Sequence, residues 1–277
     1  MPKLPQTWSA VAAAALSLSL AGCSMTRTQA PVVESAPVQL YAAGSLREAF
    51  TEIARDHEVR TGQRVALTFG ASGLLRERIE KGEPAQVFAS ADTSHPQRLA
   101  ERGGWQPPVV FTRNALCALT SDQISATPDT LLATLLRSDV RLGTSTPKAD
   151  PSGDYAWALF RQAEAIQPGA YAQLDRKALK LTGGADSPKP PVGRGTYAWV
   201  MDQRQADVFL TYCTNAVAAQ TEVPRLRVVQ LPAALQVGAA YGLTVRADAS
   251  PAALAFAAAL REPAARAVLQ KLGFGQP

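Results

Sequence analysis

Short apolar runs alternate with amphipathic segments along most of this chain. Each apolar run has the length of a buried strand, and the segment after it carries apolar residues three or four positions apart, as a helix with one buried face does. The predicted strands in the first part are 38–42, 65–69 and 87–89, and the predicted helices are 46–62, 74–81 and 96–102. This order predicts an α/β fold in which mainly parallel sheets are flanked by helices.

The second part of the chain has the same alternation without a close internal sequence repeat. Predicted strands are 115–120, 140–143, 208–212, 227–231 and 241–245, and predicted helices are 155–166, 197–205 and, as one or two helices, 252–272. This amount of α/β material predicts two small lobes rather than one sheet. We expect lobe I to comprise 37–114 plus 236–277 and lobe II to comprise 115–235, with crossings near Asn114 and Leu235.

The first 36 residues follow a different pattern. Lys3 precedes an apolar run from about Trp8 to Leu20, which is shorter than a membrane span of about 20 residues and typical of a signal peptide. The run ends in Leu20-Ala21-Gly22-Cys23, which resembles a bacterial lipobox. We therefore expect a lipoprotein signal peptide at 1–22, a lipid anchor on Cys23, a flexible tether at 23–36, and a periplasmic or cell-envelope location. The alternative is an ordinary signal peptide with an incidental cysteine.

Composition narrows the classes of function. Among 277 residues, Lys plus Arg exceeds Asp plus Glu by 28 − 23 = 5, and the basic residues are dispersed, which favours a small anion over nucleic acid as the partner. The two histidines and three cysteines lack the spacing of metal ligands, which argues against a Cys/His zinc site. In an exported protein, Cys117 and Cys213 either form a disulfide or are two buried thiols.

Serine and glycine gather where predicted strands end and helices begin. The turns are 42–45, 69–73, 149–155 and, more weakly, 191–196. Such turns offer backbone N–H groups, the positive end of a helix and hydroxyl donors to a ligand. A single turn is weak evidence, because Ser45 with Glu48 also fits a helix-capping box. Several of them in a two-lobed chain predict a site for a small, fully ionised oxyanion.

Several segments then resemble the solute-binding proteins of molybdate ABC transporters. They are LYAAGSLREAFTEIA (40–54), VALTFGASGLLRERIEKGEPAQVFASAD (65–92), ADPSGDYAWALF (149–160) and QADVFLTYCTNAV (205–217). The resemblance implies a type II periplasmic binding protein whose two lobes close on molybdate or tungstate and then meet a membrane permease. It also implies the ligand-binding groups, which are the hydroxyls of Ser45 and Ser72, the helix-start amide at Ser152, the Tyr212 hydroxyl and an amide at or near Arg194.

The resemblance also sets expectations about partners. We expect no cofactor and no direct metal ligand, because the metal arrives as an oxyanion. We expect a monomer whose partners are the small anion, the ABC transporter permease and, through Cys23, a membrane. The chain departs from the family in its short loop at Asp150-Pro151-Ser152 and in having Arg194 where an apolar residue is common, which indicates a divergent branch. The Arg194 side chain either contacts the anion or points to solvent.

Other functions stay open at this point. Sulfate, phosphate or phosphonate are alternative ligands, and Asp150 or Asp154 could accept the proton that phosphate retains. A serine hydrolase-like enzyme is a weaker alternative, because Gly70-Ala71-Ser72-Gly73-Leu74 lacks the last glycine of a nucleophile elbow. His57 and His95 lie in polar stretches, which favours surface positions, so no catalytic residue is assigned. A lipoprotein that senses or adheres without transport also fits.

Overall fold

The computed structural model describes residues 1–4 and 36–277. The chain divides into two units, Met1–Glu34 and Ser35–Pro277, and the second unit carries the fold described below. Most of the predicted signal peptide, the proposed anchor Cys23 and nearly all of the tether fall within 5–35, outside the described residues. In the residues that are described, every helix is too short or too polar to cross a membrane.

The first half of the sheet is built on strand β1. Strands β2 and β3 pair in parallel with β1 on its two sides, and β9 pairs antiparallel with β3. The strands are β1 (Val38–Ala43), β2 (Val65–Gly70), β3 (Val87–Ser90) and β9 (Gly238–Val245). The helices of this half are η1 (Gly44–Leu46), α1 (Arg47–Thr61), α2 (Ser72–Glu80), α3 (Ser94–Glu101), α9 (Pro251–Ala259) and α10 (Pro263–Lys271).

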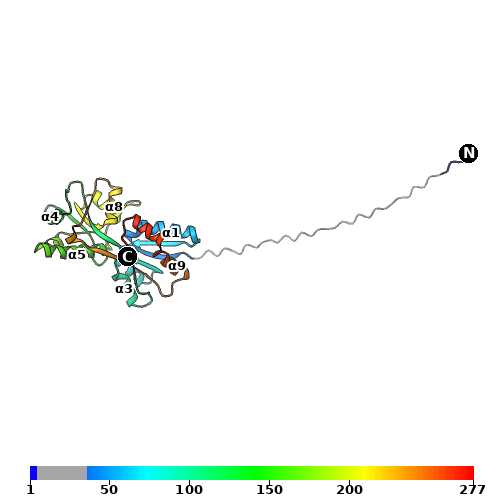
Figure 1. Ribbon diagram of the computed structural model, residues 1–277, viewed down its shortest axis with the longest axis horizontal. Helices are drawn as coiled ribbons and strands as arrows, with labels where there is room; N and C mark the ends of the chain where they lie inside the picture. Colours follow the sequence, from blue (N-terminus) through cyan, green and yellow to red (C-terminus); the bar gives the residue numbers. More distant parts are fainter. Residues whose placement is uncertain (5–35) are drawn as a thin grey trace. The chain divides into compact units, whose positions relative to one another are not determined.

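The second half of the sheet is built on strand β5, which pairs in parallel with β6 and β7. Its strands are β5 (Leu142–Ser145), β6 (Leu179–Thr182), β7 (Val208–Tyr212) and β8 (Arg227–Gln230). Its helices are α4 (Leu131–Leu136), α5 (Pro151–Ile166), α6 (Ala170–Lys177), α7 (Thr196–Asp202), α8 (Cys213–Glu222) and η2 (Ala233–Leu235). Figure 1 shows α4, α5 and α8 at one end of the unit and α1, α3 and α9 at the other.

Strand β4 (Val109–Thr120) joins the two halves. Its first part, to Ala115, pairs with β9, and its last part, from Leu116, pairs with β7 and, from Cys117, with β8. The described strands therefore form one hydrogen-bonded path, β2-β1-β3-β9-β4-β7-β5-β6 with β8 on β4. The sequence predicted two lobes rather than one sheet, whereas the strands of both halves are joined into one path, because this strand of 12 residues is long enough to enter both halves. The α/β class is confirmed, the sheet is mixed, and the exact lobe bounds stay a prediction.

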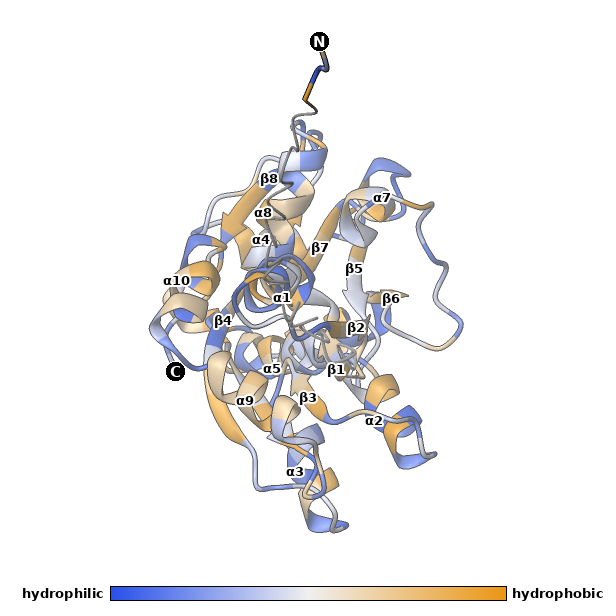
Figure 2. Ribbon diagram, turned by 90° about the vertical axis from the view of Figure 1, so that its right-hand side faces the viewer, coloured by the Kyte–Doolittle hydropathy of each residue, from blue (hydrophilic) through white to orange (hydrophobic). Residues whose placement is uncertain are grey.

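A large apolar core fills the space between sheet and helices and extends across both halves. Hydrophobic residues concentrate on the strands, whereas the loops and outer helix faces are hydrophilic (Figure 2). The bulkiest buried side chains include Phe50, Phe111, Phe160, Tyr212 and Tyr241. A smaller cluster beneath α7 and α8 contains Cys117 and Phe209, and Cys213 packs against it.

Cys117 and Cys213 form a disulfide, which decides between the two alternatives that the sequence left open. The bond joins β4 to the first residue of α8 across 96 positions of sequence. Closing a loop of that length removes conformational entropy from the unfolded chain and contributes about 4–5 kcal/mol in the chain-entropy model.

Both histidines are buried, so the expectation of surface positions is wrong. His57 and His95 keep only 6% and 5% of their surface exposed. His57 lies on the buried face of α1, where its ring packs edge-to-face against Phe256 of α9, with ring centroids 4.9 Å apart. Desolvation lowers the pKa of both imidazoles, which are therefore neutral at physiological pH.

Candidate functional site

Two of the predicted ligand residues, Ser72 and Tyr212, both form a hydrogen bond with Ala91, in the loop that follows β3. The Ser72 hydroxyl oxygen accepts a hydrogen bond of 3.1 Å from the backbone N–H of Ala91. The Tyr212 hydroxyl donates to the Ala91 carbonyl oxygen at 3.2 Å. Ser72 begins α2 in the first half of the sheet, and Tyr212 ends β7 in the second half. The two halves are therefore joined by polar contacts at the loop that follows β3.

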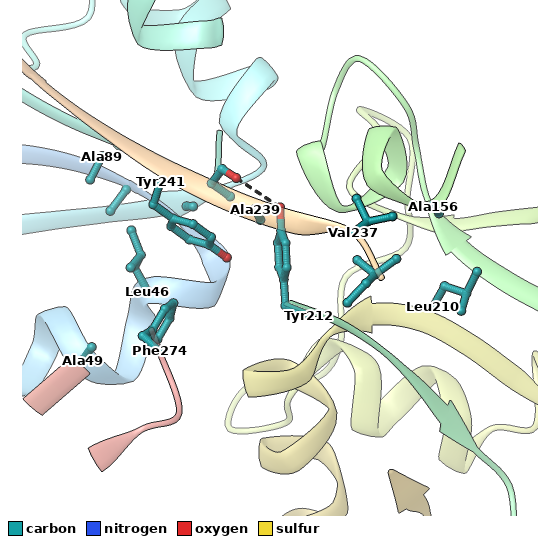
Figure 3. Close-up of a cluster of buried hydrophobic side chains, with 14 of the residues drawn as sticks. Leu46, Ala49, Ala89, Ala156, Leu210, Tyr212, Val237, Ala239, Tyr241 and Phe274 are labelled. Carbon is teal, nitrogen blue, oxygen red and sulfur yellow. Dashed lines mark hydrogen bonds between the residues drawn. The ribbon is translucent and has the colours of Figure 1, made fainter. Parts of the chain in front are cut away.

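Ser45 belongs to the same group through a second tyrosine. Its hydroxyl lies 2.9 Å from the hydroxyl of Tyr241 on β9, and neither η1 nor α1 has a side-chain cap. The capping interpretation of Ser45 is therefore wrong, because a tertiary contact takes the hydroxyl instead. Figure 3 shows Tyr241 and Tyr212 side by side, and their ring centroids are 5.5 Å apart. Asn114 of β4 also donates to the Tyr241 hydroxyl, at 3.3 Å.

Ser152 lies at the start of α5, completely buried. Its backbone N–H donates to the carboxylate of Asp150, the N-cap residue, at 3.1 Å. The helix-start amide that the resemblance implied is thus already engaged. The Ser152 hydroxyl, in contrast, has no hydrogen-bond partner. A buried hydroxyl without a partner is costly unless a ligand or water satisfies it, so it is the more available donor.

The loop before α5 touches the start of α2. The N–H of Gly73 donates to the Ala149 carbonyl oxygen at 2.8 Å. A Cβ at Gly73 would lie 2.8 Å from that oxygen and closer still to the carbonyl oxygen of Lys148. This contact places the loop that leads into α5, and with it Asp150 and the first turn that contains Ser152, against the helix that begins with Ser72. Sequence reasoning missed Gly73, although the Gly-Ala-Ser-Gly pattern of small residues signalled a close backbone approach.

The structure does not bring the Arg194 side chain into this group. Its guanidinium, about a third exposed, pairs with Asp202 at 3.1 Å and with Glu222 at 2.5 Å. It lines a different, open hollow with Gly193, Asp202, Glu222, Val223, Pro224 and Arg225. The two carboxylates, with Glu222 first, raise its pKa. The ion pairs direct Arg194 toward its acidic neighbours and argue against its use as an anion ligand.

Carboxylates and tyrosines set the electrostatics around the serines. The pKa of Asp150 is raised to about 6, first by desolvation and then by the charges of Asp154 and Asp92, although hydrogen bonds from Ser152 and Ser145 lower it in part. Burial also raises the pKa of Asp154. Desolvation raises the pKa of Tyr212 well above its ordinary value, so its hydroxyl stays a neutral donor. The group thus combines neutral hydroxyl donors with nearby acidic side chains.

The arrangement suits binding better than bond-making. The partner of the Ser72 hydroxyl is a backbone amide rather than a histidine. His95 instead has its Nε2 atom 4.0 Å from the carboxylate of Asp92. A nucleophilic serine needs a base within hydrogen-bond reach, and the described contacts of Ser72 provide none. Within residues 1–4 and 36–277, no group of three or more His, Cys, Asp or Glu side chains is placed to hold a metal ion.

The family model for bacterial extracellular solute-binding proteins matches residues 38–275. This chain belongs to that family. An uncharacterized protein of Pasteurella multocida, PM1146, is 41% identical over 179 residues, which are 64% of this chain and 74% of the relative. The molybdate-binding protein ModA of Mycobacterium bovis is 27% identical over 251 residues, 89% of this chain and 87% of the relative.

Solved structures agree on the fold. The periplasmic molybdate-binding protein of Azotobacter vinelandii superimposes with a TM-score of 0.67 at 20% identity, covering 87% of this chain and 99% of that one. The sulfate-binding protein SubI of Mycobacterium tuberculosis superimposes with a TM-score of 0.70 at 17% identity, covering 87% and 86%. The predicted two-lobed periplasmic binding fold and the likeness to the molybdate-binding branch are confirmed.

Family membership fixes the coarse function. The chain is a solute-binding protein of the ABC importer type, a class that works outside the cytoplasm, binds a small ligand and meets a permease. Proteins of this class are not normally enzymes. The neighbours differ in the anion that their names record, so the family alone does not select the ligand.

Proposed function

We propose that this chain binds a small tetrahedral oxyanion, molybdate or tungstate, between its two lobes and presents it to an ABC transporter permease. One observation carries the proposal: Ser72 and Tyr212, from opposite halves of the sheet, meet at Ala91. Ser45 joins them through Tyr241, and the unpartnered hydroxyl of Ser152 lies in the first turn of α5, just after the loop that contacts the start of α2.

The donor chemistry supports a fully ionised anion. Ser72 uses an oxygen lone pair toward Ala91, so its hydroxyl proton is free to point at a ligand. Ser152 keeps its whole hydroxyl available. Hydrogen bonds to a charged group contribute roughly 1.5–3 kcal/mol each, so four or five of them give about 6–15 kcal/mol, a range that includes the ~8 kcal/mol of micromolar binding before desolvation and closure are subtracted. The metal enters within the oxyanion and needs no protein ligand of its own.

A thermal-shift panel tests the proposal directly. Purified protein lacking residues 1–22 is heated with molybdate, tungstate, sulfate, phosphate or a phosphonate at equal concentration and ionic strength. Because a ligand that binds only the folded state raises the unfolding temperature, molybdate and tungstate should give the largest shifts. Calorimetry on the best anion then gives the dissociation constant. Equal shifts for all five anions, or none, would remove the ligand assignment.

A phosphate-type anion is the second candidate, and a specific observation favours it. Asp150, the partly buried N-cap residue of α5, has its pKa raised to about 6, so a carboxyl group that can share a proton lies beside Ser152. A monoprotonated anion gains from such an acceptor, whereas a fully deprotonated anion is repelled by it. The phosphate and phosphonate arms of the panel separate this candidate from molybdate.

Removing single hydroxyls should weaken binding without unfolding the protein. Ser72→Ala and Tyr212→Phe each delete one polar contact at Ala91 while keeping the apolar packing of the site. We expect each to reduce the binding free energy by about 1–3 kcal/mol. Calorimetry with molybdate measures the loss, and circular dichroism checks the fold. Unchanged affinity in both variants contradicts the site assignment.

Arg194→Ala serves as the matched variant outside the site. Because its guanidinium is held by Asp202 and Glu222, we expect molybdate affinity within about twofold of the parent protein at low and high salt. A strong loss that salt diminishes would show that the guanidinium reaches the anion after all. The same calorimetric titration measures both outcomes.

We also propose that the mature chain is anchored to a membrane through a lipid, that it contacts the transporter permease and that it is a monomer. Lipidation of Cys23 follows from the lipobox-like residues before it. Mass spectrometry of the protein purified from membranes should show a mature chain that begins at a diacylated Cys23. A chain cut at another small residue and carrying no lipid would instead indicate an ordinary signal peptide.

A further inference from the structure

We propose that the Cys117–Cys213 disulfide is a positioning element for Tyr212, so that closure of the two lobes, and with it anion affinity, depends on the disulfide being formed. The inference rests on the proposed function for its effect on affinity. It begins from adjacency in the chain, since Cys213 directly follows Tyr212. Tyr212 is the last residue of β7, and Cys213 is the first residue of α8.

The backbone of Tyr212 is held from two sides. Before it, β7 pairs with β4 so that Tyr212 lies opposite Leu116 and Thr211 lies opposite Cys117. After it, Cys213 turns back and is bonded to Cys117 itself, with the two Cα atoms 4.8 Å apart. Tyr212 also serves as the N-cap residue of α8, where no side chain caps the helix. The disulfide is therefore the covalent element that fixes the direction in which the chain leaves Tyr212.

The two neighbouring side chains enter different cores. Cys213 packs against the smaller cluster beneath α7 and α8, which contains Cys117. Tyr212 belongs to the large core that both halves share, and its ring lies 5.5 Å from Tyr241 and 6.2 Å from Tyr155. Anchoring Cys213 in one core thus aims Tyr212 into the other, where its hydroxyl reaches the carbonyl oxygen of Ala91.

The remaining contacts of α8 should preserve the fold when the disulfide is broken. Thr214 accepts a hydrogen bond of 2.8 Å from Asn114, and Asn215 donates to Thr211 at 3.2 Å. These bonds keep the first turn of α8 close to its position in the oxidised protein, but they permit small shifts at the end of β7. Because the Tyr212 hydroxyl bond is 3.2 Å long, a shift of a few tenths of an ångström weakens it.

Reduction is a defined chemical step. Dithiothreitol attacks the sulfur–sulfur bond through a mixed disulfide, the bond breaks into two protein thiols, and the dithiol is oxidised to its cyclic disulfide. Cys117 is buried, whereas Cys213 is partly exposed, so attack begins at Cys213. The matching variant, Cys117→Ala with Cys213→Ala, lacks the bond under all conditions.

The test is a cycle of four proteins without their first 22 residues, titrated with molybdate in oxidising and reducing buffer. They are the parent chain, the double cysteine variant, Tyr212→Phe, and Arg194→Ala as a control. We expect reduction to weaken molybdate binding by about tenfold in the parent chain and in Arg194→Ala. We expect no further loss in Tyr212→Phe, and the double cysteine variant should bind like the reduced parent chain in both buffers.

The pattern across the cycle separates positioning from general stabilisation. Loss of the disulfide lowers the unfolding temperature of the parent chain and of Tyr212→Phe alike, so only affinity distinguishes the two roles. An unchanged affinity in the reduced parent chain overturns the proposal. A loss in Tyr212→Phe as large as in the parent chain also overturns it, because the disulfide would then act through other residues.

A measurement without any anion keeps the inference independent of the ligand. Hydrogen exchange of a peptide covering 87–92 reports the Ala91 amide, which donates to Ser72 next to the Tyr212 contact. Reduction should speed exchange of this segment in the parent chain and leave it unchanged in Tyr212→Phe. If no anion of the panel binds the oxidised protein, the proposed function fails, while this exchange pattern still supports or overturns the positioning role.

Discussion

Gly73→Ala is expected to abolish tight anion binding while leaving the protein folded. An added methyl group would lie 2.8 Å from the Ala149 carbonyl oxygen, and nearer to that of Lys148, both of which belong to the backbone. Neither backbone group moves away easily, so the start of α2 and the loop before α5 must separate. The hydrogen bond from Gly73 to Ala149 is then lost as well. We expect affinity for molybdate to fall by about 100-fold, which corresponds to a loss of about 2.7 kcal/mol in the free energy of binding, because closure becomes less favourable.

The unliganded protein reveals whether this loss comes from closure or from misfolding. Alanine is a better helix former than glycine, so α2 itself should not be weakened by the change. Gly238→Ala is the matched control, since a Cβ there meets no atom within 4 Å and its φ is not positive. Calorimetry measures affinity, and small-angle scattering with and without anion measures closure. Tight binding by Gly73→Ala contradicts a site formed between these two segments.

The local elements were predictable because their sequence patterns are strong. Apolar runs located β1, β2, β3 and β7, helical spacing located the helices that follow the first three of them, and the small residues of 69–73 located the turn that carries Ser72. The elements that were missed have weak patterns. Helix α8 presents only Ala216 and Ala219 as buried side chains, α4 has six residues, and β6 is largely exposed.

Tertiary contacts decided what the local sequence could not. Ser45 has the sequence of a helix cap, but its hydroxyl lies against Tyr241, which is 196 positions away. His57 lies in a polar stretch, yet the packing of α1 on α9 buries it. Arg194 follows a proline-rich loop that gives no sign of its acidic partners. The proposed anion preference likewise depends on the tertiary placement of hydroxyl donors and carboxylates, among them Asp150.

Asp150→Asn is expected to change both stability and ligand preference, because the carboxyl group is partly buried and accepts the N–H of Ser152. Burial raises its pKa from 3.8 to about 6, so the folded state holds the proton more tightly than the unfolded state. Stability contributed by this group is therefore greatest at low pH and falls as the pH rises from about 4 to about 6. The difference corresponds to about 3 kcal/mol at neutral pH.

Asparagine should remove this pH dependence. Its amide oxygen can still accept the Ser152 N–H, and asparagine is as good an N-cap residue as aspartate. At pH 7 we expect the free energy of unfolding to rise by up to about 3 kcal/mol, and at pH 4 the gain should be nearly gone. Urea denaturation at both pH values measures it. Asp248→Asn is the control, because that side chain is 75% exposed and its loss changes net charge equally.

The same variant discriminates between the two candidate ligands with opposite signs. A fully deprotonated anion at this site is repelled by Asp150, and by Asp154 and Asp92, whose charges already raise the pKa of Asp150. Removing one of these charges should strengthen molybdate binding several-fold, more at low salt than at high salt. A phosphate that donates its proton to Asp150 loses that hydrogen bond and should bind about tenfold more weakly. Calorimetry of both anions at pH 7.5 therefore separates the two ligand classes: weaker molybdate binding in Asp150→Asn contradicts the expected repulsion between this carboxylate and the anion.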